Sequence, residues 1–134
     1  TGGLLSAYLT AVPGVSSVYE LGVTSYSCRI KNEVLGVSKT TLDTFGAVSE
    51  AAAREMAEGV RKKASADFGV SVTGVAGPDG SEGHNPGLVY IAVSDKGGTA
   101  VKKLDIDPLN RDYVRSEAVK NALELLINTV KEVK

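Results

Sequence analysis

The 134-residue chain has only one cysteine and one histidine, the residue types that form disulfides and bind zinc. It also contains no tryptophan. Cys28 is the only cysteine, so the chain cannot form an internal disulfide. A zinc site and a histidine-based catalytic triad both lack their usual parts. We interpret His84 as a solvated loop residue and Cys28 as a small residue at a helix start. Chemistry other than that of a zinc site or a histidine triad must therefore be considered, and we expect no cofactor.

Neither sign of charge dominates, and no long apolar run is present. Lys and Arg number 15 against 16 Asp and Glu, which gives a formal net charge of -1. Bulk charge therefore gives no reason to expect nucleic acid or a membrane surface as partner. The apolar runs are shorter than the ~20 residues that a membrane-spanning helix needs. We expect one cytoplasmic domain over residues 1–134, in which any anion site is local.

The first half of the chain predicts mostly helices. An apolar spacing of helical type begins at Leu4 and ends before Pro13-Gly14, a pair that cannot continue a helix. Ser38 and Ser49 are placed to cap a short and a longer helix, because serine hydroxyls accept hydrogen bonds from free backbone amides. The predicted elements are a helix over 4–12, a strand over 20–27, a helix over 30–35, a helix from Ser38 through Leu42 and a helix from Ser49 to Ala64.

The second half predicts three strands and a long helix. A β-rich run over 68–73 leads into a polar loop that continues to Pro86. Runs over 88–93 and 99–106 flank a turn at 95–98, which is typical of an antiparallel hairpin. The final helix is expected over 110–133, with an apolar repeat at Val119, Ala122, Leu126, Val130 and Val133. These elements predict a single-domain α/β layered fold, with a mixed sheet flanked by helices on both faces.

Five polar side chains near predicted strand ends and turns are candidates for a site: Ser16, Tyr26, Lys31, Thr73 and Arg111. The pattern leaves a structural alternative open for each of the first four: a cap, a packed ring, a solvated charge and a strand residue. Arg111 differs because it follows Asn110, the expected cap of the last helix. The helix dipole disfavours a cation there by about 0.3–1 kcal/mol, a conflict that a bound phosphate would remove.

Two glycine-rich segments give a ligand close access to backbone amides. The first is Thr1-Gly2-Gly3, and the second runs from Thr73-Gly74 to Gly80. Neither is a nucleotide-binding P-loop, because no Lys-Ser/Thr pair follows the glycines. As isolated clusters they are equally consistent with simple turns.

Taken together, these segments resemble the C-terminal domain of the competence/damage-inducible protein CinA, the nicotinamide mononucleotide amidohydrolase family. The resemblance spans essentially the whole chain, with its landmarks in a fixed order. They are Thr1-Gly2-Gly3-Leu4-Leu5, Val12-Pro13-Gly14 with Ser16-Ser17, Gly22 through Tyr26-Ser27, Lys31, Leu35-Gly36-Val37, Gly46-Ala47-Val48-Ser49-Glu50, Met56-Ala57-Glu58-Gly59 and Thr73-Gly74-Val75-Ala76-Gly77-Pro78.

The resemblance implies an α/β fold, a homo-oligomer (dimer or trimer) and metal-independent hydrolysis of the carboxamide of nicotinamide mononucleotide, a pyridine mononucleotide, to nicotinic acid mononucleotide and ammonia. It makes Ser16 the nucleophile, Lys31 its base and Tyr26 a further catalytic residue. Substrate binding then falls to Thr73, Gly74, Arg111, Thr1 and Gly2, with Arg111 on the phosphate.

The chain also departs from the family pattern. Family members carry a Glu-Ser-Cys segment immediately before Thr-Gly-Gly, and its serine belongs to the site. This chain opens at Thr1, so we expect it to lack an N-terminal helix and strand of the domain. That expectation keeps an alternative open, a noncatalytic nucleotide-binding or competence-related scaffold domain. Phosphoryl transfer at the glycine-rich loops is a third and weaker hypothesis.

Overall fold

The computed structural model describes residues 1–133. Helices form most of the first half of the chain, and three consecutive strands followed by one long helix form the second. In chain order the elements are α1 (Leu4–Thr10), the 3-10 helix η1 (Val15–Ser17), α2 (Cys28–Leu35), α3 (Lys39–Phe45), α4 (Glu50–Ala64), β1 (Gly69–Gly74), β2 (Leu88–Asp95), β3 (Gly98–Asp105) and α5 (Arg111–Val133).

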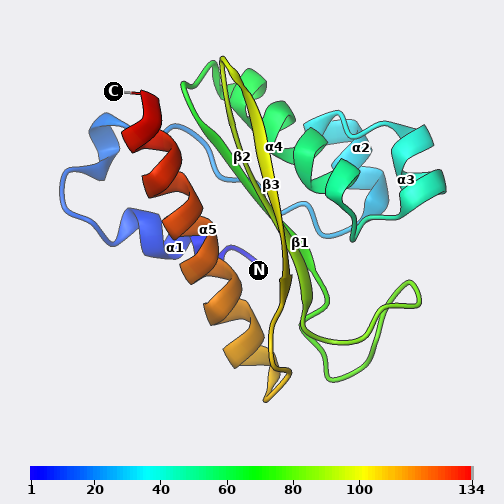
Figure 1. Cartoon of the computed structure of the whole chain (residues 1–134). Helices are drawn as coiled ribbons and strands as arrows, with labels where there is room; N and C mark the ends of the chain where they lie inside the picture. The colour runs from blue at the N-terminus through cyan, green and yellow to red at the C-terminus, as the bar shows by residue number, and fades with distance from the viewer. Residues whose placement is uncertain (134) are drawn as a thin grey trace.

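The elements form three layers with the sheet in the middle. Figure 1 shows α1 and α5 on one side of the strands and α2, α3 and α4 on the other. The contacts agree, since α4 and α5 both pack on β1 and β2, α2 and α3 pack on α4, and η1 packs on α1. The prediction of a single-domain α/β fold with helices on both faces is confirmed.

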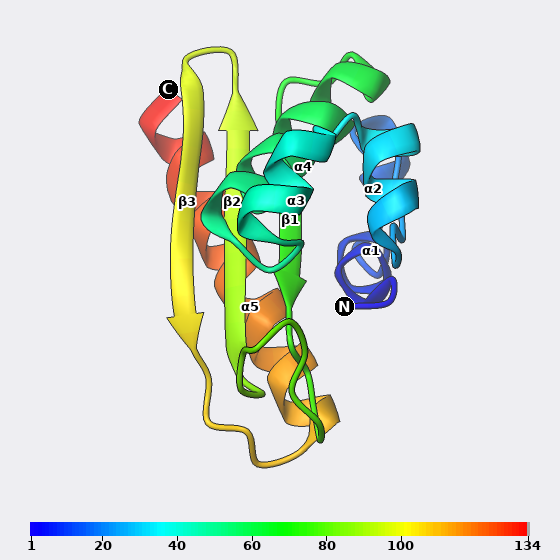
Figure 2. The same ribbon diagram turned by 90° about the vertical axis from the view of Figure 1, so that its right-hand side faces the viewer.

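The sheet is antiparallel, with the order β1-β2-β3, so β1 and β3 are its edges (Figure 2). The register pairs Gly74 with Val89 in β1–β2, and Asp95 with Gly98 where β2 and β3 join. Asp95 Oδ1 accepts hydrogen bonds from the backbone N–H groups of Gly97 (2.6 Å) and Gly98 (3.1 Å), which closes the turn. The predicted hairpin is confirmed.

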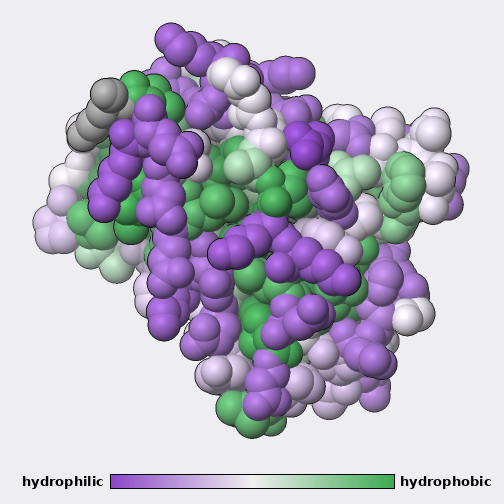
Figure 3. All heavy atoms as spheres, viewed as in Figure 1, coloured by the Kyte–Doolittle hydropathy of each residue, from purple (hydrophilic) through white to green (hydrophobic). Residues whose placement is uncertain are grey.

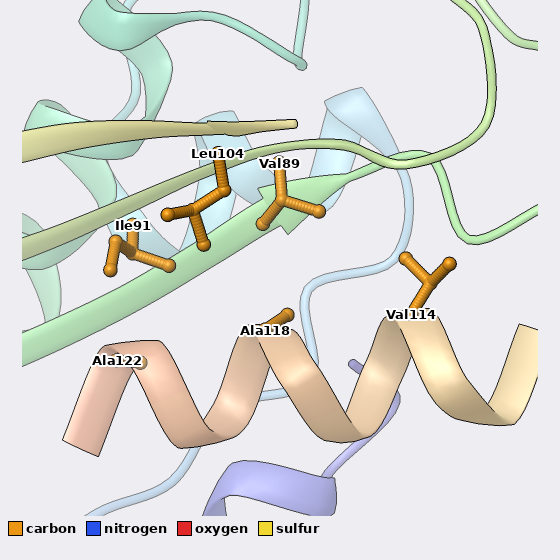
Figure 4. Packing of buried hydrophobic residues seen from close by; sticks show 6 residues of the cluster. All are labelled: Val89, Ile91, Leu104, Val114, Ala118 and Ala122. Carbon is orange, nitrogen blue, oxygen red and sulfur yellow. The ribbon is translucent and has the colours of Figure 1, made fainter. Parts of the chain in front are cut away.

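The main core lies between the sheet and α5. Val114, Ala118 and Ala122 are spaced by four residues, so they occupy one face of the helix. That face packs against Val89, Ile91 and Leu104 of the sheet, as Figure 4 shows. Ile91 and Ala122 are fully excluded from solvent. Of the predicted stripe Val119 and Ala122 are buried, whereas Val133 is exposed. Leu126 and Val130 are half-buried, because they line the groove along β1.

On the other face, small side chains bring α4 close to the sheet. Ala53 and Ala57 pack against Ala92 of β2, and all three are completely buried. The Ser71 hydroxyl donates a 2.6 Å hydrogen bond to the carbonyl oxygen of Ala53, which joins β1 to α4. This close contact fixes the start of α4 relative to the end of β1.

Three predicted helix caps are confirmed. Ser38 Oγ accepts a hydrogen bond from Thr41 N at 3.0 Å, and Ser49 Oγ accepts one from Ala52 N at 3.1 Å. Asn110 Oδ1 accepts one from Tyr113 N at 2.8 Å, so Asn110 caps α5. Each of these signals is local in sequence, which is why the pattern revealed them.

The strand expected over residues 20–27 is wrong. Residues 20–26 belong to no helix or strand, and the backbone carbonyls of Ser25 and Tyr26 accept hydrogen bonds from the Lys31 side chain instead of from a neighbouring strand. A β-compatible sequence forms a strand only where another strand pairs with it. Without this fourth strand, the sheet of residues 1–133 is antiparallel and not mixed.

Apolar side chains are exposed around α1 and η1. Tyr8, Val12 and Val18 lie in or beside these helices, and Val18 keeps 76% of its surface exposed. Figure 3 shows apolar atoms gathered on this side of the molecule. The homo-oligomer stays a prediction. In the described part of the chain, no helix is long and apolar enough to cross a membrane.

A substitution at Gly59 tests the contact between α2 and α4. A Cβ at this position would collide with the carbonyl oxygen of Leu35, at the end of α2. Gly→Ala in an open helix stabilises by about 1 kcal/mol, but overpacking costs about 1–3 kcal/mol. We therefore expect Gly59→Ala to lower the free energy of unfolding in urea. Lys62→Ala, on the exposed face of the same helix, is the control. A Gly59→Ala protein as stable as the parent would contradict this packing.

Candidate functional site

A groove of about 1200 Å³ follows the free edge of β1. The edge is free because β1 pairs only with β2. Leu5, Leu9, Leu126 and Val130 are among the apolar residues of its walls. The polar candidates gather where β1 ends and α5 begins, and they include Thr1, Gly2, Tyr26, Lys31, Thr73, Gly74 and Arg111. The structure therefore brings seven of the eight predicted site residues to one groove.

Lys31 lies on α2 and is buried, with 7% of its surface exposed. Its Nζ donates a 2.7 Å hydrogen bond to the Ser25 carbonyl oxygen and a weaker one, at 3.4 Å, to that of Tyr26. Burial lowers the pKa of Lys31 below its usual value, and this outweighs the opposing effects of Cys28, Glu82 and Tyr26. A lysine in this setting loses its proton more readily than one in solvent.

Arg111, the first residue of α5, connects three distant segments of the chain. Its Nη1 donates to the Gly77 carbonyl oxygen at 2.8 Å, and its Nη2 donates to the Tyr26 hydroxyl at 3.0 Å. Neither acceptor is charged, and among residues 1–133 Arg111 has no carboxylate partner. Its positive charge at the start of a helix remains available to an anion.

Thr1 and Gly2 lie beside this group. Arg115, one helical turn beyond Arg111, donates to the Thr1 carbonyl oxygen from Nε (3.1 Å) and Nη2 (3.0 Å). Lys31 and Arg111 also lie close enough to Thr1 for their charges to act there. Three cationic side chains therefore converge on the start of the chain.

Thr73 and Gly74 form the end of β1. The Thr73 hydroxyl donates to the Ala47 carbonyl oxygen at 2.7 Å, so it braces the approach to α4. Val75 N–H donates to the Leu88 carbonyl oxygen at 2.9 Å and is therefore already used. Because hydrogen-bonding direction alternates along a strand, Gly74 N–H points to the free edge and into the groove. This amide is placed to donate to a ligand.

Ser16 is the predicted site residue that the structure does not bring to the groove. It lies exposed on η1, which packs on α1, whereas Lys31 belongs to α2 and the layer of α4. Figure 1 shows η1, in blue, on the far side of α1 and α5 from α2. The Lys31 amine donates to the carbonyls of Ser25 and Tyr26 and not to Ser16.

Sequence reasoning missed two residues of this region. Arg115 stands four residues after Arg111 on the last helix, a spacing that puts both on one face and was visible in the sequence. Glu82 lies in the loop after β1 and hydrogen-bonds to backbone N–H groups near the start of α4. No sequence signal connects Glu82 with residues some 35 positions away.

The geometry combines a buried amine, a guanidinium that has no carboxylate partner among residues 1–133, and a backbone amide that faces the same groove. A buried lysine of lowered pKa is suited to take up a proton. A guanidinium at a helix start is suited to a phosphate or carboxylate. The region is therefore equipped to bind an anionic small molecule and to move a proton beside it.

Comparison with known proteins gives a consistent family. The CinA C-terminal domain model matches residues 1–130. A relative from Acetivibrio thermocellus, named after competence and damage induction, is 50% identical over 135 residues, which cover 100% of this chain and 32% of the relative. The chain thus spans about a third of the length of the curated relatives that it matches.

Solved structures agree. The competence damage-inducible protein A from Klebsiella pneumoniae has a TM-score of 0.94 and 35% identity, covering 99% of this chain and 83% of that one. The competence/damage inducible protein CihA from Agrobacterium tumefaciens has a TM-score of 0.90 and 39% identity, covering 95% of this chain and 78% of that one.

The lowered pKa of Lys31 predicts a stability that depends on pH. Between that pKa and about 10.4, the folded protein binds fewer protons than the unfolded chain, so its stability rises with pH. We expect the parent protein to gain free energy of unfolding relative to Lys31→Met as the pH is raised from 7 to 10. Urea titrations measure the difference, with the exposed Lys62→Met as control. A constant difference would argue against a perturbed amine.

Proposed function

Because the chain belongs to the CinA C-terminal domain family, we propose that it hydrolyses the carboxamide of nicotinamide mononucleotide to nicotinic acid mononucleotide and ammonia. The observation that supports the proposal is the position of Lys31 and Arg111 in one groove. The two ends of the substrate need different partners, a base near the carboxamide and a cation near the phosphate. The groove offers one of each.

Lys31 is proposed as the general base. In its neutral form, Nζ takes the proton of an attacking hydroxyl while the hydroxyl oxygen bonds to the carboxamide carbon. The same proton then passes to the amide nitrogen, the carbon–nitrogen bond breaks and ammonia departs. The acyl group remains bound to the hydroxyl oxygen as an ester. Water then adds to the ester carbon and gives one proton to Lys31. The ester bond breaks, and the departing oxygen takes that proton from Lys31, which regenerates the hydroxyl. Burial lowers the pKa of Lys31 and so favours the neutral form that this cycle needs.

The remaining residues are proposed to bind the substrate. Arg111, together with Arg115, binds the phosphate by charge-assisted hydrogen bonds. Gly74 N–H donates to the oxyanion that forms during attack. Tyr26 holds Arg111 through its hydroxyl and orients the site. Thr73 holds the end of β1 through its hydrogen bond to Ala47, and Thr1 and Gly2 line the groove.

Two hydroxyls compete for the role of nucleophile. The sequence hypothesis assigns it to Ser16, which needs η1 to move toward Lys31 because the two lie in different layers. The family resemblance offers the serine of the Glu-Ser-Cys segment, which stands two residues before the Thr-Gly-Gly tripeptide. That serine enters next to Thr1, where Lys31, Arg111 and Arg115 converge. This proximity to Lys31 supports the second source.

A second candidate function is nucleotide binding without catalysis. The observation in its favour is the distance in the fold between Ser16 and Lys31, which leaves the base of residues 1–133 without the predicted nucleophile. Such a domain would bind the mononucleotide at Arg111 and release no ammonia.

One assay separates these possibilities. A longer protein that includes the Glu-Ser-Cys segment is incubated with nicotinamide mononucleotide, and ammonia is measured. We expect Lys31→Ala to lower kcat by at least about 100-fold, because general base catalysis contributes that much. Ser16→Ala should leave kcat within a few-fold if the preceding serine attacks, and should abolish release if Ser16 does. If the parent protein binds the nucleotide but releases no ammonia, the result would contradict the hydrolase proposal and support nucleotide binding without catalysis.

A further inference from the structure

Glu82 adopts an unusual backbone conformation in the loop between β1 and β2. Its φ is 53°, in the left-handed region that non-glycine residues seldom occupy. It stands at the tip of a tight turn that Ser81 and His84 close through two backbone hydrogen bonds of 3.1 and 2.8 Å. Such conformations persist where surrounding contacts hold them in place. The contacts of Glu82 are therefore informative.

Both carboxylate oxygens of Glu82 are used. Oε2 accepts a hydrogen bond from Ala47 N and Oε1 accepts one from Val48 N, each at 3.0 Å. A Cβ at Gly46 would lie 3.2 Å from both oxygens, so the glycine leaves space for the carboxylate. The side chain thus ties the loop to the backbone just before α4.

The same anchor reaches two site residues. The Ala47 carbonyl accepts from Thr73 (2.7 Å), and Gly77, in the same loop as Glu82, accepts from Arg111 (2.8 Å). Glu82 therefore fixes one part of a loop whose other part is held by Arg111. Loosening Glu82 would loosen the groove wall on which Arg111 depends.

Glu82 also lines the groove into which Lys31 is buried. The groups whose charge raises the pKa of Lys31 are Cys28, Glu82 and Tyr26. Glu82 is the one carboxylic acid among these three. The cations Arg111 and Arg115 line the same groove. Glu82 therefore brings an acidic side chain to the groove that Lys31 and the two arginines line.

We propose that Glu82 is a positioning residue of this site, which anchors the loop after β1 to the start of α4 and supplies the negative charge that faces Lys31. Its importance for catalysis rests on the proposed function. Its effect on Lys31 does not, because it is measurable in a protein that hydrolyses nothing.

The test follows the titration of Lys31 by NMR in protein with ¹³C-labelled lysine, assigned with Lys31→Arg. In Glu82→Gln the charge is lost while the side-chain volume is kept, so the pKa of Lys31 should fall relative to the parent. Glu82→Asp keeps the charge on a shorter side chain and should titrate near the parent. Asp79→Asn removes a charge from the same loop and should leave Lys31 unchanged.

A Lys31 titration in Glu82→Gln that matches the parent would overturn the proposal, as would an equal shift in Asp79→Asn. If the longer protein releases ammonia, the acidic limb of its kcat/KM profile should move to lower pH in Glu82→Gln in parallel with the NMR shift. A role in loop stability alone lowers the rate at every pH without moving that limb. If no ammonia is released by any variant, the proposed function fails and the NMR result still decides the role of Glu82.

Discussion

Arg111 joins parts of the chain that are otherwise independent. Its guanidinium reaches the Gly77 carbonyl in the loop after β1 and the Tyr26 hydroxyl before α2, from the first turn of α5. These three segments come from different layers of the fold (Figure 1). Because both acceptors are neutral, the guanidinium organises the groove and keeps its charge for an anion. The rest of the site is arranged around this bridge.

Lys31 differs from Arg111 because its burial in the fold disfavours its charged form. Two backbone carbonyls hold its amine, yet burial makes the ammonium form less favourable than it is in water. An arginine that stays charged and a lysine that readily becomes neutral thus line one groove. This division suits a substrate with a permanent anion at one end and a group that needs a base at the other.

The elements predicted correctly from the sequence are those whose signals are local. Ser38, Ser49 and Asn110 cap helices within three residues of their partners, and the turn at 95–98 lies inside its own hairpin. The segment over 20–27 has strand-forming residues, but whether a strand pairs with it depends on the rest of the fold. Its local pattern therefore predicted a strand that the sheet does not include.

The site residues also differ in whether a local sequence signal identifies them. The family landmarks include Lys31, Tyr26 and Thr73, and Arg111 was singled out by its place at the start of the last helix. The fold brings all four to one groove. Ser16 was grouped with them by order along the chain, but order does not say which layer η1 joins. Arg115 was accessible through its four-residue spacing from Arg111, whereas Glu82 acts across a separation that no local pattern encodes.

The most direct measurement is a crystal structure of the longer protein carrying Lys31→Ala, soaked with nicotinamide mononucleotide so that the substrate is not turned over. The account predicts the phosphate within hydrogen-bonding distance of the Arg111 guanidinium and the carboxamide beside position 31, close to Gly74 N–H. A nucleotide bound away from this groove, or one with its phosphate far from Arg111, would contradict it.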